Sequence, residues 1–399
     1  MTERGKPGSA GPAALSRRRM LLTASAGAGV LAAGGGGAAW WLLSGREERP
    51  EEPWKAEPLA SYEPEVAPPP LWRLPRVGAA EGPPPVPIGR YVAYAAAGGG
   101  IAARTVARGA AAWRNGDADA GRGLVAASGL LLAADVAGRV LALDPETGRP
   151  RWVAAAAHAT TLLAADPLTL YARTRSPRGR RDEQGAAGWI VAISLKDGAT
   201  LWRSPSPVRL PARAAAASAR LVLYGDEGDV AALDATSGVV SWRRKELGHA
   251  ALSPYTDDGM VYLGGAELLS LSLADGKERW RLTADGDRGW GAPSAHDGRV
   301  YACEGATLRA LSTDDGDAEG WSLPLTYKGA APSPVIQHRT LCLPTTDSER
   351  AGLTFCDLAT GRPAWTYPPA STPGTWRLAA SGNRIFAARG ATLSAMPVI

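Results

Sequence analysis

Tryptophan recurs through this chain at a nearly constant interval. Eight of its 14 tryptophans follow one another after 41, 39, 50, 40, 38, 41 and 44 residues: Trp72, Trp113, Trp152, Trp202, Trp242, Trp280, Trp321 and Trp365. A fixed period of this length is typical of a repeat architecture, in which each unit is one small group of elements. Such a unit cannot bury its own apolar faces, so the units must stack against one another.

Each repeat predicts short antiparallel strands joined by tight turns. A glycine lies four residues before most of the eight tryptophans, and a short apolar segment ending in Asp or Ser precedes it, as in residues 140–148 and 230–238. Asp and Ser side chains bond backbone N–H groups in turns, and glycine accepts the positive φ that such turns need. The chain therefore reverses, and the tryptophan falls on the next strand.

Two more short apolar segments precede this hairpin in each repeat. Four strands in about 41 residues match one blade of a β-propeller. The sequence after Trp365 predicts three strands near residues 376–379, 384–387 and 392–396, and residues 71–73 predict one strand with no predecessors. Pairing these pieces would close the ring and remove its exposed edges. We predict an all-β, eight-bladed β-propeller over residues 71–399, closed by its N- and C-terminal strands, with seven blades as the alternative.

Residues 1–43 have the order of an export signal. Basic residues at 17–19 precede an uncharged, Ala- and Gly-rich stretch from Met20 to Leu43. The pair Arg17 and Arg18 resembles a twin-arginine translocation signal, and Sec export or plain membrane insertion is the alternative. The stretch is long enough to span a bilayer as a signal or anchor helix, and its cleavage stays open. We expect an exported protein, on the extracytoplasmic face of the cytoplasmic membrane or secreted.

Residues 44–70 differ in composition from the repeats, because they are rich in Glu and Pro and poor in aliphatic residues. Such a segment favours an extended, semi-rigid form, so we predict a linker between the membrane and the propeller. Residues 1–43 also carry most of the excess charge: the formal net charge is +5 for the whole chain and +1 without them. No broad basic field remains to bind nucleic acid.

The segment Ala-Leu-Asp-x-x-Thr-Gly-x-x-x-Trp, as in residues 142–152, resembles the repeat of the PQQ-like β-propeller family, and variants of it cover nearly all of residues 71–399. The resemblance implies that the eight tryptophans pack between neighbouring blades. It implies no single activity, because the family includes quinoprotein dehydrogenases, non-catalytic scaffolds and sensor domains.

Catalytic residues are not evident in this sequence. The resemblance implies that a quinoprotein dehydrogenase would carry acidic calcium ligands and two adjacent cysteines, whereas Cys303, Cys342 and Cys356 are all separated. The register that we infer places Cys342 and Cys356 diagonally, and their disulfide state stays open. The four histidines fall in different repeats without metal-ligand spacing. We assign no catalytic residue, cofactor or metal.

The resulting functional prediction is a monomeric, non-catalytic propeller that binds a protein, a peptide or a cell-envelope component. A PQQ-dependent quinoprotein oxidoreductase and a sensor of a small anionic ligand are the alternatives.

Two groups of basic residues are candidate binding sites. Four basic residues each lie 11 residues before the start of a predicted strand, at Arg220, Met260, Arg299 and Arg339: Arg209, His249, Arg288 and Lys328. Their loops lead into the innermost strands, which line the channel, so they predict a basic arc at its mouth. Trp290 and Trp376 lie near the same level and could add a stacking surface. The second group is the insertion at residues 173–188, which holds five arginines and predicts either a solvated loop or a docking site for an acidic partner.

Overall fold

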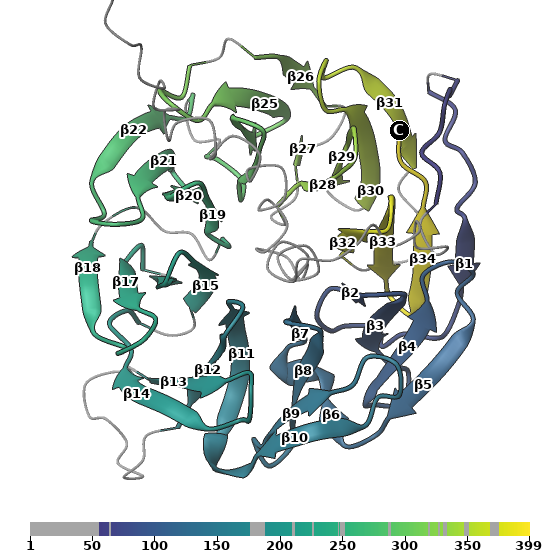
Figure 1. The fold of residues 1–399 in the computed structure, drawn as a ribbon. Coiled ribbons are helices and arrows are strands. Elements are labelled where there is room, and N and C mark those ends of the chain that lie inside the picture. Colours follow the sequence, from purple (N-terminus) through teal and green to yellow (C-terminus); the bar gives the residue numbers. More distant parts are fainter. Residues whose placement is uncertain are drawn as a thin grey trace, which may run out of the picture.

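The computed structural model describes residues 56–63, 65–175, 188–209, 212–225, 227–245, 247, 252–285, 289–317, 320–325, 328–329, 333–346, 351–367 and 375–399. In these residues the chain forms eight antiparallel sheets arranged as the blades of a ring (Figure 1). The prediction of eight blades is confirmed, and the seven-bladed alternative is wrong.

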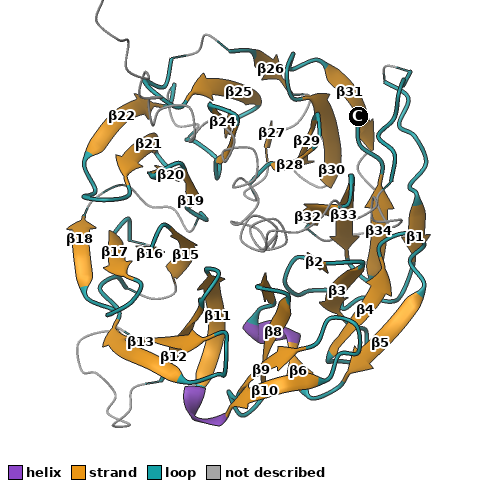
Figure 2. Cartoon of the chain, in the orientation of Figure 1, coloured by secondary structure: helices purple, strands orange, loops and turns teal. Residues whose placement is uncertain are grey.

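Helix is almost absent from the described residues. They contain only two 3-10 turns, η3 (Ala120–Arg122) and η4 (Ala155–Ala157) (Figure 2). None of the helices in this part of the chain is long and apolar enough to cross a membrane. The predicted signal or anchor helix, with Arg17 and Arg18, lies outside the described residues.

We number the blades in chain order and give their strands from the centre of the ring to its rim. The strands of blades 1 to 4 are β2 (Val86–Ile88), β3 (Tyr91–Ala95), β4 (Ile101–Thr105) and β5 (Ala111–Asn115); β6 (Ala118–Asp119) with β7 (Val125–Ala127), β8 (Leu130–Asp135), β9 (Val140–Leu143) and β10 (Pro150–Ala154); β11 (Ala159–Ala165), β12 (Thr169–Thr174), β13 (Trp189–Ser194) and β14 (Thr200–Pro205); and β15 (Ala212–Ala217), β16 (Arg220–Gly225), β17 (Val230–Asp234) and β18 (Val240–Arg244).

The strands of blades 5 to 8 are β19 (Tyr255–Asp257), β20 (Met260–Leu263), β21 (Glu267–Ser272) and β22 (Glu278–Thr283); β23 (Ser294–His296), β24 (Arg299–Glu304), β25 (Thr307–Ser312) and β26 (Ser322–Pro324); β27 (Lys328–Gly329) with β28 (Val335–Gln337), β29 (Thr340–Thr346), β30 (Ala351–Asp357) and β31 (Pro363–Tyr367); and β32 (Arg377–Ser381), β33 (Arg384–Arg389), β34 (Thr392–Met396) and β1 (Trp72–Leu74).

Blade 8 closes the ring by joining distant parts of the sequence. Its three inner strands come from the last part of the chain, and its rim strand β1 pairs antiparallel with β34, with Trp72 opposite Ala395. The innermost strands of successive blades contact one another around the centre, including β2 with β32 and with β7. The predicted closure by N- and C-terminal strands is therefore confirmed.

The tight turns before the rim strands of blades 1 to 7 have the predicted geometry. In blade 2 the Asp144 carboxylate accepts hydrogen bonds from the backbone N–H groups of Glu146 and Thr147, at 2.9 and 3.0 Å. Gly148 follows with φ of 68°. A Cβ atom there would lie 2.4 Å from the ring of Trp113 in blade 1, so glycine is needed both for its φ and for this close contact.

The same contact recurs at seven blade junctions. Each time, a rim tryptophan lies over the turn glycine of the next blade, and its indole N–H donates to a backbone carbonyl there at 2.7–3.0 Å. These tryptophans are Trp72, Trp113, Trp152, Trp202, Trp242, Trp280 and Trp321. In blade 3, for example, a bulge before Trp202 places it opposite the small Ala192, and such bulges redirect a side chain.

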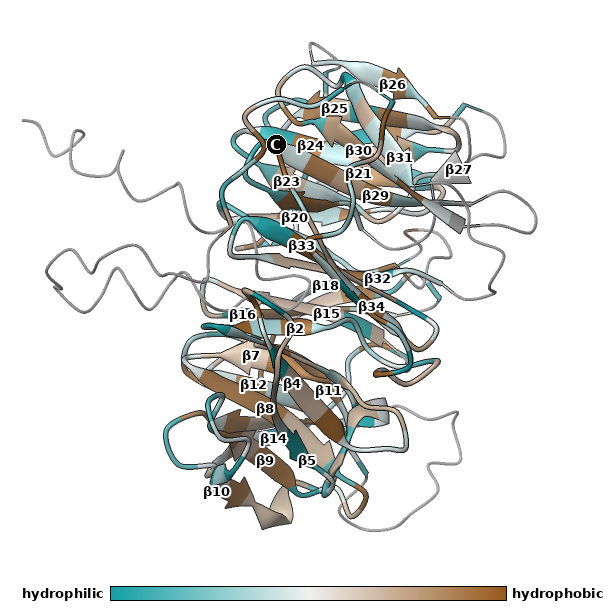
Figure 3. Ribbon diagram, turned by 90° about the vertical axis from the view of Figure 1, so that its right-hand side faces the viewer, coloured by the Kyte–Doolittle hydropathy of each residue, from teal (hydrophilic) through white to brown (hydrophobic). Residues whose placement is uncertain are grey.

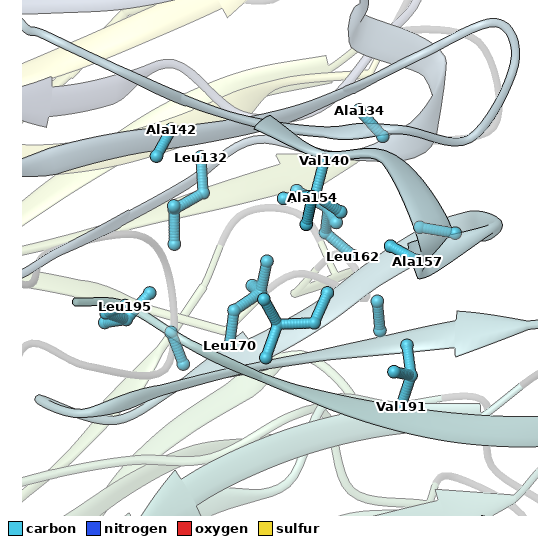
Figure 4. Packing of buried hydrophobic residues seen from close by; sticks show 14 of the residues in the cluster. Leu132, Ala134, Val140, Ala142, Ala154, Ala157, Leu162, Leu170, Val191 and Leu195 are labelled. Carbon is cyan, nitrogen blue, oxygen red and sulfur yellow. The ribbon is translucent and has the colours of Figure 1, made fainter. Parts of the chain in front are cut away.

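The hydrophobic core lies between blades as well as within them. The cluster in Figure 4 joins Leu132 and Val140 of blade 2 to Leu170 and Val191 of blade 3, all fully buried. Burying a Leu or Val side chain contributes about 1.5–3 kcal/mol, so each blade depends on its neighbours. In the side view of Figure 3, strands such as β8 and β9 consist mainly of hydrophobic residues.

The junction of blades 7 and 8 differs from the other seven. No turn connects β34 to β1, and Trp365 has no hydrogen-bond acceptor for its buried indole N–H among the described residues. Residues 56–63 and 65–70 lie at this junction without regular secondary structure. The backbone N–H of Glu65 donates to the Ala364 carbonyl at 2.9 Å, and the ring of Tyr62 meets Trp365 edge-on at 5.3 Å.

We call residues 56–63 and 65–70 the seam segment. It belongs to the part of the sequence for which we predict an extended linker. The described part of that linker packs on the propeller: Leu59 donates its N–H to the Val398 carbonyl at 2.8 Å, and the Tyr367 hydroxyl donates to the Pro68 carbonyl at 2.6 Å. The boundaries of the linker stay a prediction.

Candidate functional site

The predicted basic arc is only partly described by the structure. Arg209 follows β14, is exposed, and forms an ion pair with Glu227 in the turn before β17. His249, Arg288 and the side chain of Lys328 lie outside the described residues. A common ligand site for these four residues therefore stays a prediction.

The two tryptophans predicted beside the arc have different environments. Trp290 is only 5% exposed and packs with the apolar residues of blades 5 and 6. The guanidinium carbon of Arg309 lies 5.9 Å from its ring centroid. Trp376 is half-buried, and the Arg389 guanidinium carbon lies 5.2 Å from its ring. Arg309 and Arg389 thus already stack on these two indoles, as cations do on aromatic faces.

A pocket of about 640 Å³ opens between blades 2 and 3. Its polar side chains are Arg122, His158, Thr160, Arg175 and Arg203, and the rest of its lining is Val136 and three alanines. Arg122 comes from η3, His158 follows η4, Arg175 follows β12, and Arg203 lies on the rim strand β14. We call this the interblade pocket.

Close backbone packing forms one wall of the interblade pocket. Gly138, in the turn between β8 and β9, has φ of 86°, and a Cβ there would lie 2.9 Å from the carbonyl oxygen of Ala159. The N–H of Ala159 donates to the Gly138 carbonyl at 2.8 Å. His158 has a left-handed φ of 50°, and this conformation ends η4 just before β11 begins.

Arg122 fixes that wall through three bonds. Its side chain donates to the carbonyl oxygens of Ala159 and Val136, at 2.6 and 2.7 Å, and its Nε lies 3.2 Å from the Asp119 carboxylate. Arg122 is therefore chiefly structural. Arg203 donates once to the Ala156 carbonyl, which leaves its remaining N–H groups without a partner among the described residues.

The sequence indicated only one component of this pocket. Arg175 belongs to the insertion at residues 173–188 that we singled out, although residues 176–187 lie outside the described part. Arg203 lines the pocket only because blades 2 and 3 pack together, and the spacing of the repeats does not reveal this contact. The 3-10 turn η4 interrupts the repeat, so its position could not be predicted from the spacing either. A signal was present in the alanine run before His158, because no other repeat has such a run directly after its rim strand.

All three cysteines lie in blades 6 and 7. Cys303, Cys342 and Cys356 are free and buried, and Cys356 lies opposite Leu341, diagonal to Cys342 as predicted. Burial raises the pKa of Cys303 to about 12 and raises the pKa values of Cys342 and Cys356 as well. These thiols are therefore protonated and unreactive at neutral pH.

The donor set in the described part of the chain does not fit PQQ with calcium. No two cysteines are adjacent in the sequence, so a disulfide between neighbouring residues cannot form. Among the residues that the structure describes, no group of three or more His, Cys, Asp or Glu side chains could hold a metal ion. His338, for example, has its Nδ1 2.5 Å from the Ile399 carbonyl oxygen and serves that backbone contact.

Comparisons with known proteins agree with the architecture. The family model described as outer membrane protein assembly factor BamB matches residues 69–178, 186–267 and 263–395. No curated protein sequence gives a significant match. The crystal structure of BamB from Moraxella catarrhalis is 16% identical, with a TM-score of 0.56 over 78% of this chain and 95% of that one.

Two other solved structures are similarly alike in fold. The computationally designed Ika8 protein is 13% identical, with a TM-score of 0.61 over 81% of this chain and all of that one (100%). Quinohemoprotein alcohol dehydrogenase from Comamonas testosteroni is 12% identical, with a TM-score of 0.55 over 84% of this chain and 78% of that one. The family match covers most of the sequence, and the protein therefore belongs to the PQQ-like β-propeller repeat family.

Proposed function

We propose that this protein is an exported, non-catalytic β-propeller that binds a protein, a peptide or a cell-envelope component. The family description, outer membrane protein assembly factor, supports a partner-binding role of this general kind. The fold alone does not decide between binding and catalysis, because the similar structures include an alcohol dehydrogenase. The proposal therefore depends on the surface of this chain.

One arc of the rim carries the supporting observation. The outermost strands of blades 2, 3 and 4 expose aliphatic side chains: Val153 on β10 is 44% exposed, Leu201 on β14 is 50%, and Val240 on β18 is 42%. Each of these strands also has one edge that pairs with no other described strand. The rim strand β22 of blade 5 instead carries the charged Glu278, Arg279 and Arg281.

Edge strands with exposed aliphatic residues suit recognition of a protein segment. Free backbone N–H and C=O groups can pair with an added strand, and alternate side chains supply the specificity. The three strands are neighbours at the rim (Figure 1). A partner could therefore contact several blades at once, in keeping with a scaffold.

Site-specific photo-crosslinking tests this surface. A photoreactive amino acid at Leu201, in the full chain in its own cell envelope, should give one discrete adduct, and the same residue at the exposed Arg279 should not. Val153→Asp should then reduce the Leu201 adduct without changing the melting temperature. Equal adducts at both positions, or none at Leu201, would contradict a partner at this arc.

A second experiment addresses the oxidoreductase alternative directly. Purified protein is incubated with PQQ and calcium and assayed for dye-linked alcohol oxidation. We expect no turnover above the protein-free control, because this chain has no adjacent cysteines and its three thiols are buried. Turnover that depends on both additives would replace the proposal with the enzymatic alternative.

A further inference from the structure

The interblade pocket has an unbalanced charge. None of its lining residues is acidic, while Arg122, Arg175 and Arg203 line it together with His158. The charge of Arg122 is neutralised by its ion pair with Asp119, which does not line the pocket. Arg175 and Arg203 form no ion pair with any residue that the structure describes. Two guanidinium charges therefore face the pocket without an acidic partner among the described residues.

The repeat shows how an arginine at this position can be paired with an acid. In blades 4 and 5 the residue after the rim tryptophan is also arginine, and it pairs with an acid at the start of the neighbouring strand: Arg243 with Asp229 at 2.5 Å, and Arg281 with Glu267 at 2.5 Å. In blade 3, Arg203 lies opposite Val191 on β13. The residue two positions before Val191, where the other two blades have the acid, is Trp189. Blade 3 thus lacks the acid that blades 4 and 5 have at this position, as blade 1 does at Gly100 beside Arg114, and Arg203 is left for another anion.

The backbone around the pocket is also compatible with a bound anion. Carbonyl oxygens repel negative groups, but those of Ala159 and Val136 already accept bonds from Arg122, and those of Ala157 and His158 accept from the Thr174 hydroxyl at 3.0 Å. Four carbonyl oxygens at this wall therefore already accept hydrogen bonds. Guanidinium groups bind phosphate through two parallel N–H bonds.

The size of the pocket favours a small organic molecule over a lone ion. A volume of about 640 Å³ lies within the usual range of about 300–1,000 Å³ for small-molecule sites. Val136 and the neighbouring alanines offer an apolar surface for the carbon part of such a ligand. We propose that the interblade pocket binds a small phosphate ester, with Arg203 and Arg175 holding the phosphate. The site adjoins the partner surface, because Arg203 and Leu201 both lie on β14, but it takes a ligand of a different class.

Titration calorimetry on the full chain tests the site. The probes are inorganic phosphate and glycerol 3-phosphate, and co-sedimentation with phosphatidylglycerol vesicles, against phosphatidylcholine vesicles, tests the same group in a lipid. We expect saturable binding of glycerol 3-phosphate, tighter than that of inorganic phosphate. Binding to the phosphatidylglycerol vesicles alone would assign the site to a lipid headgroup.

Three substitutions distinguish this pocket from general surface charge. Arg203→Gln and Arg175→Gln should each weaken binding about tenfold or more, because each removes charge-assisted hydrogen bonds. Arg243→Gln, at the same repeat position but paired with Asp229, should leave affinity within about twofold. Arg175 is exposed, so its replacement keeps the test valid if Arg203→Gln does not fold.

Two results would overturn the proposal. One is the absence of saturable binding of every phosphate probe, both soluble and lipid. The other is a failure of the variants to distinguish the pocket: either all three lose binding equally, or neither Arg203→Gln nor Arg175→Gln loses any binding. Both patterns would place the interaction elsewhere. Neither result would affect the photo-crosslinking at Leu201, so the two proposals can fail separately.

Discussion

Seven junctions of this ring are joined through a turn, and the eighth is joined through a separate segment of chain. At the seven, an indole lies on a glycine of the next blade and donates to a carbonyl, as Trp202 does to Ala235 at 2.8 Å. At the junction of blades 7 and 8, Trp365 has neither the glycine nor an acceptor among the described residues. Tyr62 of the seam segment meets its ring instead.

The difference follows from where the ring is closed. A turn can form only between strands that follow each other in sequence, and β34 and β1 do not. Blade 7 compensates with aromatic packing: Phe355 lies opposite Trp365, with stacked rings 5.3 Å apart. Other blades have a small residue there, such as Ala192 in blade 3 and Ser270 in blade 5. The repeat thus supplies seven junctions, and residues outside the repeat supply the last.

The largest expected effect concerns a turn glycine. Gly361 has φ of 67°, and a Cβ there would lie 2.2 Å from the ring of Trp321. Gly361→Ala should therefore displace the indole and lower the free energy of unfolding by about 3–5 kcal/mol, as loss of a large buried side chain does. Urea denaturation measures the change.

Gly129→Ala is the matched control for this substitution. Gly129 has φ of 72° but nothing within 4 Å of an added Cβ, so only backbone strain of about 1–2 kcal/mol is expected. Equal effects at the two glycines would show that the indole contact does not stabilise the junction.

A smaller effect is expected at the seam segment. Tyr62→Ala removes the aromatic contact with Trp365 and should cost about 2 kcal/mol, from lost apolar burial and the ring pair. Tyr62→Phe keeps the ring and should leave the urea midpoint unchanged. If Tyr62→Ala is as stable as the parent protein, the seam segment does not hold this junction.

Acid should weaken the turn-based junctions. The Arg151 side chain lowers the pKa of Asp144, the Ser237 hydroxyl lowers that of Asp234, and the Ser272 hydroxyl lowers that of Asp275 to about 2. Unfolded aspartate titrates near pH 3.9, so these groups stabilise the fold above that pH. Their contribution is lost as pH falls from about 4 towards 2.

Denaturation between pH 5 and pH 2 checks the role of these turn carboxylates. Stability should decline most steeply below pH 4, and Asp144→Asn should make the decline slightly shallower. Glu146→Gln is the control, because Glu146 contributes its backbone N–H to the same turn and not its carboxylate, so this variant should keep the parent slope. A decline that is unchanged in Asp144→Asn would assign the acid sensitivity to other groups.

The repeated parts of the molecule were predictable from sequence, and the exceptions were not. The spacing of Trp113 and Gly148 reflects a contact that recurs in three dimensions, so periodicity indicated blades, turns and closure. The pocket at Arg203 arises where the repeat is broken, at Trp189, and only the fold shows which charge that change leaves unpaired. The role of Tyr62 was equally hidden, because a Pro- and Glu-rich segment carries no pattern that reveals its binding surface.

The comparison of the two kinds of junction is tested most directly by a pair of tryptophan-to-phenylalanine substitutions. Trp202→Phe and Trp365→Phe remove similar volume from buried sites, but only the first removes a hydrogen bond and leaves a carbonyl, that of Ala235, unpaired. We predict that Trp202→Phe lowers the free energy of unfolding by about 1–2 kcal/mol more than Trp365→Phe does. Equal losses, or a larger loss at Trp365, would contradict the account.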